Sequence, residues 1–147
     1  MAITSGIFNA ESVECSVYIA SPAAVPTSTA TNAGYDTVLK DTHNGFTTGA
    51  SSKYTIPISG NYFATAANVW PNQVNNIRAI YIKVNGTNKA TIVNQTASVF
   101  EVSTHISKLL VDLVAGDEVA VDIYQNSGGN LTPSGGETQC FFTIHKV

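Results

Sequence analysis

The side chains with the most potential for chemistry in this 147-residue sequence are three histidines, two cysteines and scattered aspartates. His43 lies in the stretch DTHNG that begins at Asp41, whereas His105 and His145 share no motif with it. Asp41, His43 and a distant serine have the residue types of a catalytic triad, but the sequence contains no GxSxG turn to expose a nucleophile. Turns and surface positions account for such histidines more simply. We therefore expect a protein that is not an enzyme.

The acidic side chains do not follow the spacing of a metal site. Asp36, Asp41, Asp112, Asp117 and Asp122 carry the hard oxygen atoms that calcium prefers, but no DxDxDG loop is present. The turn around Asp117 explains that residue without an ion. No glycine-rich loop connects a strand to a helix in the manner of a nucleotide-binding protein. We expect neither a metal nor an organic cofactor.

The two cysteines, Cys15 and Cys140, lie near opposite ends of the chain and outside any CxxC spacing. Free cysteines often behave as small buried apolar residues, and we interpret both in this way. A disulfide stays open as an alternative, since it requires that the strands at the two termini are neighbours and that the protein matures in an oxidising compartment.

The composition argues against two classes of partner, nucleic acid and the interior of a membrane. Charged residues make up 12% of the chain, about half the usual quarter, so that neutral polar side chains must cover most of the surface. The net charge is −3 and the seven Lys and Arg residues are scattered, which argues against nucleic acid as a partner. The N-terminus lacks the features of a signal peptide, and no segment approaches the roughly 20 apolar residues that span a bilayer. We expect synthesis in the cytoplasm and no membrane insertion.

Alternation of apolar and polar residues with a period of two, which is typical of half-buried strands, recurs along the chain. It predicts strands at residues 13–19, 35–40, 54–58, 62–69, 78–84, 89–93, 99–113, 118–124 and 138–145. No helix-period segment of ten residues stands out. Eight or nine short strands in a single domain indicate an all-β sandwich or jelly roll.

Two of the predicted strands contain an irregularity. Pro57 lies inside one of them, where its missing N–H is tolerated only at a sheet edge or a bulge. In the longest predicted strand the apolar residues change parity between Ile106 and Leu109. A bulge near Ser107 would bring them onto one face.

The connections between the predicted strands are of two kinds. Tight turns rich in Gly and Asn follow Ser59, Asn85 and Ala115, whereas residues 20–34 and 125–137 form long loops, as does the segment after Trp70. In an antiparallel sandwich this order places the tight turns and the termini at one end and the long loops at the other. Binding residues tend to lie on such a loop-built end, which we call the apex.

The apex contains candidate binding residues, which are Trp70, Asn72, Gln73 and Asn130. A tryptophan next to planar amides suits a sugar-binding platform, because the ring stacks on the sugar while the amides donate and accept hydrogen bonds. The commoner role of a tryptophan in this position is to lock its loop onto the sandwich.

Several segments, taken in order, resemble the globular head of complement C1q and the related TNF-like jelly rolls. They are CSVYIA from Cys15, YDTVLKDTHNGF from Tyr35, YTIPISGNYFA from Tyr54, IYIKVNG from Ile80, LLVDLVAGDEVAVDIY from Leu109 and QCFFTIHKV from Gln139. The resemblance covers about residues 12–147. It implies a jelly roll that assembles as a homotrimer, with the first and last strands paired at its centre, and it implies binding instead of catalysis.

The sequence supports oligomerisation independently. Strands predicted to meet at the centre carry bulky residues of both parities, so that one face of a monomeric sandwich would expose apolar side chains. A threefold contact would cover them. The candidates for this interface are Tyr18, Tyr62, Phe63 and Phe141.

A trimeric head without a stalk or a signal peptide is most similar to a small phage virion protein. We therefore expect a capsid decoration protein of the virion, in which residues 1–11 form an attachment arm that contacts the major capsid protein through Ile3, Ile7 and Phe8. One alternative is a tail-fibre or receptor-binding head that recognises a host surface glycan or protein. A second alternative is a secreted C1q/TNF-like ligand or lectin-like binding module.

Overall fold

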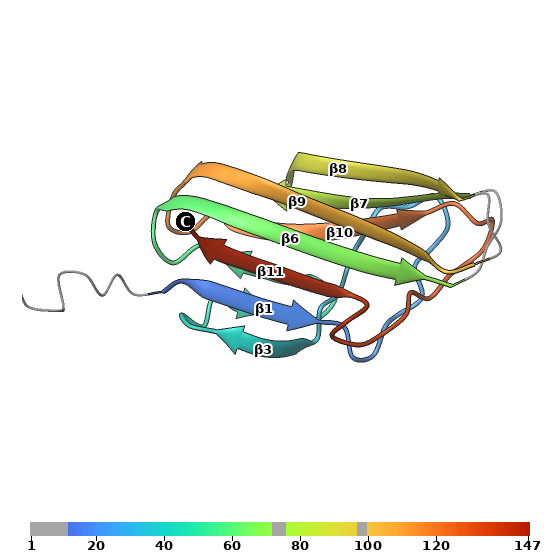
Figure 1. Ribbon diagram of the computed structural model, residues 1–147, viewed down its shortest axis with the longest axis horizontal. Helices are drawn as coiled ribbons and strands as arrows, with labels where there is room; N and C mark the ends of the chain where they lie inside the picture. Colours follow the sequence, from blue (N-terminus) through green and yellow to red (C-terminus); the bar gives the residue numbers. More distant parts are fainter. Residues whose placement is uncertain (1–11, 72–75, 97–99) are drawn as a thin grey trace, which may run out of the picture.

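A computed structural model describes residues 12–71, 76–96 and 100–147 and shows an all-β protein. Two antiparallel sheets pack face to face as a sandwich (Figure 1). The described strands are β1 (Glu14–Tyr18), β2 (Thr31–Asn32), β3 (Thr37–Asp41), β4 (Phe46–Thr47), β5 (Lys53–Thr55), β6 (Gly60–Trp70), β7 (Asn76–Val84), β8 (Thr87–Thr96), β9 (Val102–Leu113), β10 (Glu118–Gln125) and β11 (Phe141–Lys146). Sheet I has the order β3-β1-β11-β6-β9, and sheet II has the order β4-β5-β10-β7-β8, with β2 paired to β10.

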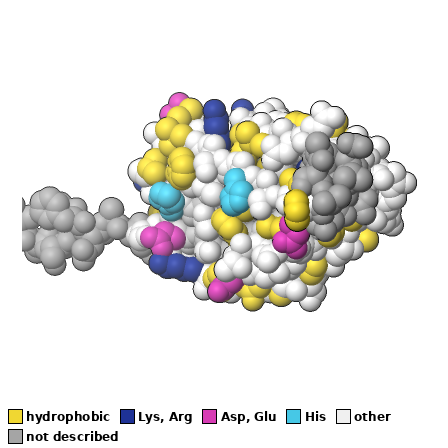
Figure 2. Space-filling view, turned by 45° about the vertical axis from the view of Figure 1, so that its right-hand side comes forward, with side chains coloured by type: hydrophobic (Ala, Val, Ile, Leu, Met, Phe, Trp, Pro, Cys, Tyr) yellow, Lys and Arg dark blue, Asp and Glu magenta, His cyan; other side chains and the backbone are white. Residues whose placement is uncertain are grey.

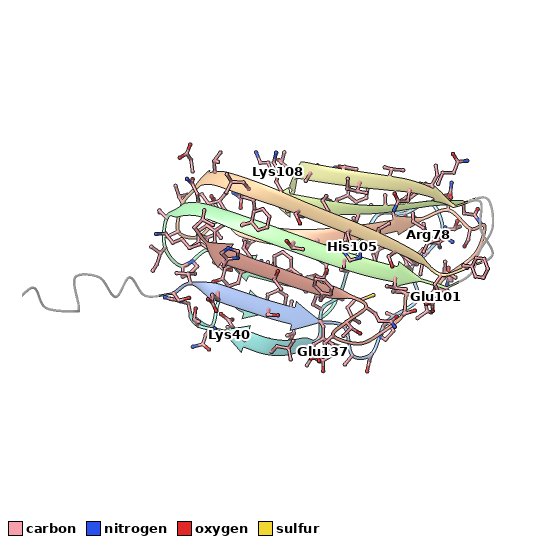
Figure 3. All side chains as sticks on the ribbon, in the orientation of Figure 1. Lys40, Arg78, Glu101, His105, Lys108 and Glu137 are labelled. Atoms are coloured by element: carbon pink, nitrogen blue, oxygen red, sulfur yellow. The ribbon has the colours of Figure 1, made fainter. Side chains whose placement is uncertain are left out.

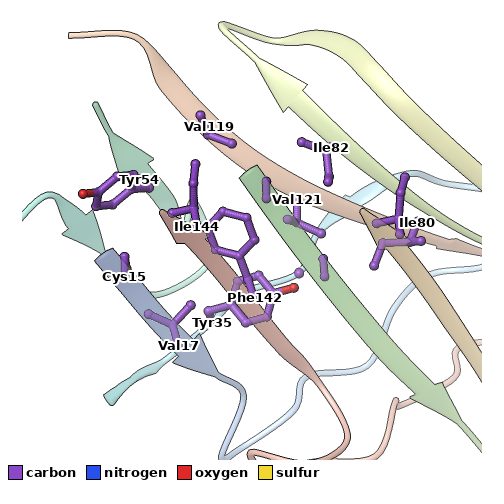
Figure 4. Close-up of a cluster of buried hydrophobic side chains, with 14 of the residues drawn as sticks. Cys15, Val17, Tyr35, Tyr54, Ile80, Ile82, Val119, Val121, Phe142 and Ile144 are labelled. Carbon is purple, nitrogen blue, oxygen red and sulfur yellow. The ribbon is translucent and has the colours of Figure 1, made fainter. Parts of the chain in front are cut away.

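The core lies between the two sheets and is built from alternate residues of each strand. In sheet I, Val17 and Phe142 point inward, and in sheet II, Ile82 and Val121 do so (Figure 4). Phe142 stacks on Tyr35, with 5.9 Å between the ring centroids. The inward side chains are almost entirely shielded from water, which is the burial that a two-layer β domain requires.

The strand predicted at 54–58 is shorter than its apolar pattern indicates. β5 ends at Thr55, and Pro57 lies beyond the paired residues. Ile56 still donates its N–H to the carbonyl of Asp117 at 2.8 Å, and its carbonyl accepts from Gly116 at 2.8 Å. Pro57 follows this last pair of hydrogen bonds, so its missing N–H removes none from the sheet.

The predicted bulge near Ser107 is wrong. Ser107 pairs regularly with Thr65 of β6, and the irregularity lies farther on, where the register shifts between Gly60 and Tyr62. Asp112, opposite this shift, has a φ of 54°. The pairing is therefore regular from Val102 to Leu110, so that Leu110 points into the core and Leu109 points away from it and is 46% exposed.

The two ends of the sandwich differ as the sequence predicts (Figure 1). The tight turns meet at the end where β1 begins and the chain terminates, and the Asp117 carboxylate accepts there from the Asn85 side chain and from the Val114 N–H, both at 2.9 Å. The long loops meet at the apex, where Val25 and Leu131 pair as a β-bridge. The side chain of Gln125 links the two loops by donating to the carbonyls of Val25 and Gly129, at 2.9 and 2.8 Å.

The variants Ile80→Ala and Ile92→Ala test the position of the core, because the two residues pair across β7 and β8. Ile80 is 0% exposed and Ile92 is 39% exposed. We expect Ile80→Ala to lower the free energy of unfolding by about 2–5 kcal/mol, since it removes buried methyl groups and leaves a cavity. Ile92→Ala, the matched control, should cost less than about 1 kcal/mol. Urea unfolding measures both, and equal losses would contradict this packing.

Candidate functional site

The outer face of sheet I is the surface that turns away from the core and crosses β1, β11, β6 and β9. Strand register arranges its side chains in three rows. The first is Tyr18, Phe141, Ala67 and His105, the second is Ser16, Thr143, Thr65 and Ser107, and the third is Glu14, His145, Phe63 and Leu109. Two rows that contain aromatic rings therefore flank a central row of hydroxyl groups.

The histidines of this face contact its aromatic rings. The ring of His145 lies 5.9 Å from that of Phe63, and the ring of His105 lies 6.4 Å from that of Phe141, both between centroids. Figure 2 shows this side of the molecule, on which the histidines lie near apolar side chains and one of them also lies beside acidic and basic side chains. His105 and His145, which share no sequence motif, are brought to one surface by the pairing of β6 with β9 and β11.

The exposed apolar area of this face is larger than the sequence predicts. Phe63, which the sequence singles out, is 37% exposed, and Leu109 and Val111 are exposed by 46% and 57%. These two residues were missed because their parity was attributed to a bulge. The signal that identifies them is the period of two that holds in β9 as far as Leu110, in which the buried Ile106 and Leu110 have one parity and Leu109 and Val111 have the other.

The interface candidates from the sequence divide into two groups. Tyr18 and Phe141 pair across β1 and β11, and both are partly exposed on the outer face, which they share with Phe63. Tyr62 instead is 0% exposed, points into the core and donates its hydroxyl to the carbonyl of Ile58 at 2.7 Å. Its assignment to the surface is corrected, because in a strand only one of two successive aromatic residues can face outward.

An open hollow of about 340 Å³ lies where this face meets the strand β3. Its polar lining comprises Glu14, Ser16, Lys40, Thr143 and His145. Glu14 forms an ion pair with Lys40, and hydrogen bonds from Lys40 and Ser12 lower the pKa of the Glu14 carboxyl. The carboxylate is thus engaged with its neighbours and stays charged at neutral pH.

The described residues contain no group of three or more His, Cys, Asp and Glu side chains that could hold a metal ion. The pair Asp41 and His43 belongs to a turn, in which the Asp41 carboxylate accepts from the N–H groups of His43 and Phe46 at 3.3 and 2.8 Å. The His43 ring lies beside the hydroxyl of Thr42, with 2.8 Å between Nδ1 and Oγ1. Local backbone geometry thus accounts for the conformation of this turn.

Trp70 does not form the stacking platform of a sugar-binding site and has the commoner role, in which it is buried against the sandwich. Trp70 is the last residue of β6 and is 0% exposed, so its ring is not available to stack on a ligand. It packs inside the sandwich, with the guanidinium carbon of Arg78 5.6 Å from its ring centroid. Asn130 is exposed on the loop after β10. The other candidates, Asn72 and Gln73 at the apex and Ile3, Ile7 and Phe8 in the N-terminal arm, lie outside the described residues.

The cysteines are both free and both buried. β1 and β11 are neighbours, but Cys15 pairs with Ile144, whereas Cys140 lies just before β11 at the other end of the strand pair. The thiol of Cys140 lies 2.7 Å from the carbonyl of Ser134. The register thus keeps the two sulfur atoms apart, and the disulfide alternative is not realised.

The fold places the chain in a structural class. It matches a crystal structure of murine APRIL at pH 8.0 with a TM-score of 0.69 and 11% identity, over 93% of this chain and 100% of that chain. It also matches Eiger TNF from S. frugiperda with a TM-score of 0.65 and 10% identity, over 92% of each chain.

These similarities show that the chain has a C1q/TNF-like jelly-roll fold, as its sequence segments indicated. No protein-family model and no curated protein sequence matches the chain. Within the described residues, no helix is long and apolar enough to cross a membrane.

The two cysteines should resist thiol reagents in the folded protein. Burial raises the pKa of Cys15 to about 12, with a further contribution from the charge of Asp41, and burial raises the pKa of Cys140 to about 11. Because the thiolate is the reactive form, we expect labelling by a disulfide reagent at pH 8 to be at least about 100-fold slower than in denaturant. Denatured protein without reductant should yield two thiols, and a yield of none would show a disulfide.

Proposed function

We propose that the chain forms a homotrimer through the outer face of sheet I and acts as a non-catalytic binding module. The observation that carries this proposal is the exposed apolar surface of that face, to which Phe63, Leu109 and Val111 contribute side chains that are 37–57% exposed. A solvated face of an antiparallel sheet is normally polar. Contiguous apolar side chains on one face indicate a contact with another macromolecule.

The distribution of ion pairs distinguishes the two outer faces of the sandwich. On the outer side of sheet II, Lys83 pairs with Asp122 and Lys53 pairs with Glu118, which is the composition of a surface in water. Among the described residues of sheet I, the ion pair of Glu14 with Lys40 lies toward the β3 edge. Charge is depleted at the centre of protein interfaces, and aromatic residues are enriched there. This comparison supports sheet I as the side that meets another copy.

A ligand-type function fits the trimer best. The similarity in fold to murine APRIL and Eiger TNF supports the TNF-like alternative more than the virion hypotheses. In a trimer built on sheet I, sheet II and the apex loops stay accessible, so that the outer surface of the assembly would engage a macromolecular partner.

The variant Phe63→Glu tests the interface, because it places a charge in the apolar face without changing the core. We expect the wild-type chain to sediment as a trimer at micromolar concentration and Phe63→Glu to raise the dissociation constant at least 100-fold, since each copy would bury an unpaired carboxylate. Val93→Glu is the control, because Val93 is exposed, at 55%, and lies on β8 of sheet II with the parity opposite to that of the core residues. A wild-type monomer, or equal dissociation of both variants, would contradict the proposal.

A second candidate is the virion decoration protein, or the related receptor-binding head. The observation that favours it is the polarity of the sandwich, because β1 begins at the tight-turn end while the loops gather at the apex (Figure 1). A trimer of such subunits would have a base for attachment to a capsid and an apex for a host glycan or protein.

Electron microscopy of virus particles that carry the chain with a bulky tag distinguishes these functions. Trimeric density on the capsid shell would support decoration, and density at the tail alone would support receptor binding. Recovery of the tagged chain from infected cells without any density on particles would contradict both.

A further inference from the structure

The core of the sandwich contains a cation near the apex. Arg78 lies in β7, toward the apex (Figure 3), and is 1% exposed, with the same parity along the strand as the buried Ile80 and Ile82. Trp70 and Asn68, which are both 0% exposed, point inward from β6. Two residues along a strand correspond to about 7 Å, so the indole and the amide are neighbours on one face. A polar layer therefore replaces the aliphatic packing found farther from the apex.

The polar groups of this layer lack hydrogen-bond partners among the described residues. The guanidinium of Arg78 donates one hydrogen bond, from Nη1 to the carbonyl of Ile77 at 3.0 Å, and its Nε has no acceptor. The indole Nε1 of Trp70 also has no acceptor, and neither the nitrogen nor the oxygen of the Asn68 side chain is paired. A buried polar group that is left unpaired costs about 1–3 kcal/mol, and a charged group costs more.

Among the described residues, no ion pair joins a carboxylate to Arg78. The ion pairs of the described residues join Lys40, Lys53 and Lys83 to their acidic partners and do not include the arginine. Residues 72–75 and 97–99, outside the described part, have the sequences NQVN and ASV and contain no acidic side chain. The stack of Arg78 on Trp70 at 5.6 Å stabilises the cation but supplies no hydrogen-bond acceptor.

We propose that this layer binds a small inorganic anion of the size of chloride. Its ligands are the Nε–H group of Arg78, the indole N–H of Trp70 and the amide N–H₂ of Asn68. The layer contains three unpaired donors, one of them cationic, and a single unpaired acceptor, the Asn68 oxygen, so that an anion satisfies the layer better than a neutral molecule. Because Arg78 is 1% exposed, a larger anion such as a sugar phosphate is excluded. The role of this ion is structural. It neutralises the buried guanidinium of Arg78 and so stabilises the apex end of the core.

The tryptophan reports on this site directly, because Trp70 is the only tryptophan in the chain. At constant ionic strength and protein concentration, replacing sodium gluconate by sodium chloride should change the Trp70 emission in a saturable way and raise Tm by about 5 °C. Gluconate is too large for the buried layer and serves as the reference anion. The absence of any chloride dependence would show that an ordered water satisfies these groups, and it would overturn the proposal.

The variant Arg78→Met identifies the residue responsible. It keeps an unbranched side chain of similar length and removes the charge, so both chloride effects should disappear. Lys89→Met, the matched control, removes one positive charge from an exposed residue of β8 and should leave both effects intact. Chloride effects that persist in a folded Arg78→Met variant, or that vanish in the control, would contradict an ion at this arginine.

Bromide gives a test that does not require a variant. Crystals of the wild-type protein soaked in sodium bromide should show an anomalous peak within about 3.5 Å of Arg78 Nε and Trp70 Nε1, which is the range of a hydrogen bond to a halide ion. Peaks confined to the protein surface would overturn the proposal, even if Arg78→Met fails to fold.

Discussion

The fold depends on the insertion of the last strand, β11, between β1 and β6. β11 exchanges backbone hydrogen bonds with both neighbours, so that the two ends of the chain meet at the centre of sheet I. Its inward residues Phe142 and Ile144 are each 1% exposed and fill the middle of the sandwich. Its outward residues Phe141 and His145 lie on the outer face. The six residues of β11 thus contribute both to the core and to the surface that we propose for assembly. A change in the position of this strand would therefore alter both.

The polarity of the side chains varies in two directions across the sandwich, between its two outer faces and between its two ends, and both differences bear on function. From face to face, sheet II carries surface ion pairs, whereas the outer side of sheet I carries aromatic and aliphatic side chains. From end to end, the core changes from aliphatic residues to the layer of Asn68, Trp70 and Arg78. A buried polar layer of this kind restricts how the sheets can pack, because each group must find its own partner. The apex loops therefore adjoin the part of the core in which buried polar groups restrict the packing most.

The sequence predicts the strands, the two ends and the fold class well, because these depend on local alternation and on turn residues such as Gly60 and Gly116. The sequence does not predict which face of a strand a residue occupies where apolar residues occur at both odd and even positions. Neither Tyr62 nor Phe63 can be assigned to a face without the register, and the outward apolar residues of β9 were explained by a bulge that lies elsewhere. Trp70 was placed on a loop because its contact with Arg78 joins two sheets and leaves no local signal. Contacts between the sheets are the information that the sequence lacks.

A crystal or electron-microscopy structure of the assembled protein tests the central claim most directly. The account predicts three copies around an axis that runs along the outer face of sheet I, with Phe63, Phe141 and Leu109 buried and the ion pairs of sheet II left in water. An assembly that buries sheet II instead, or a structure in which the outer face of sheet I stays exposed to solvent, would contradict it.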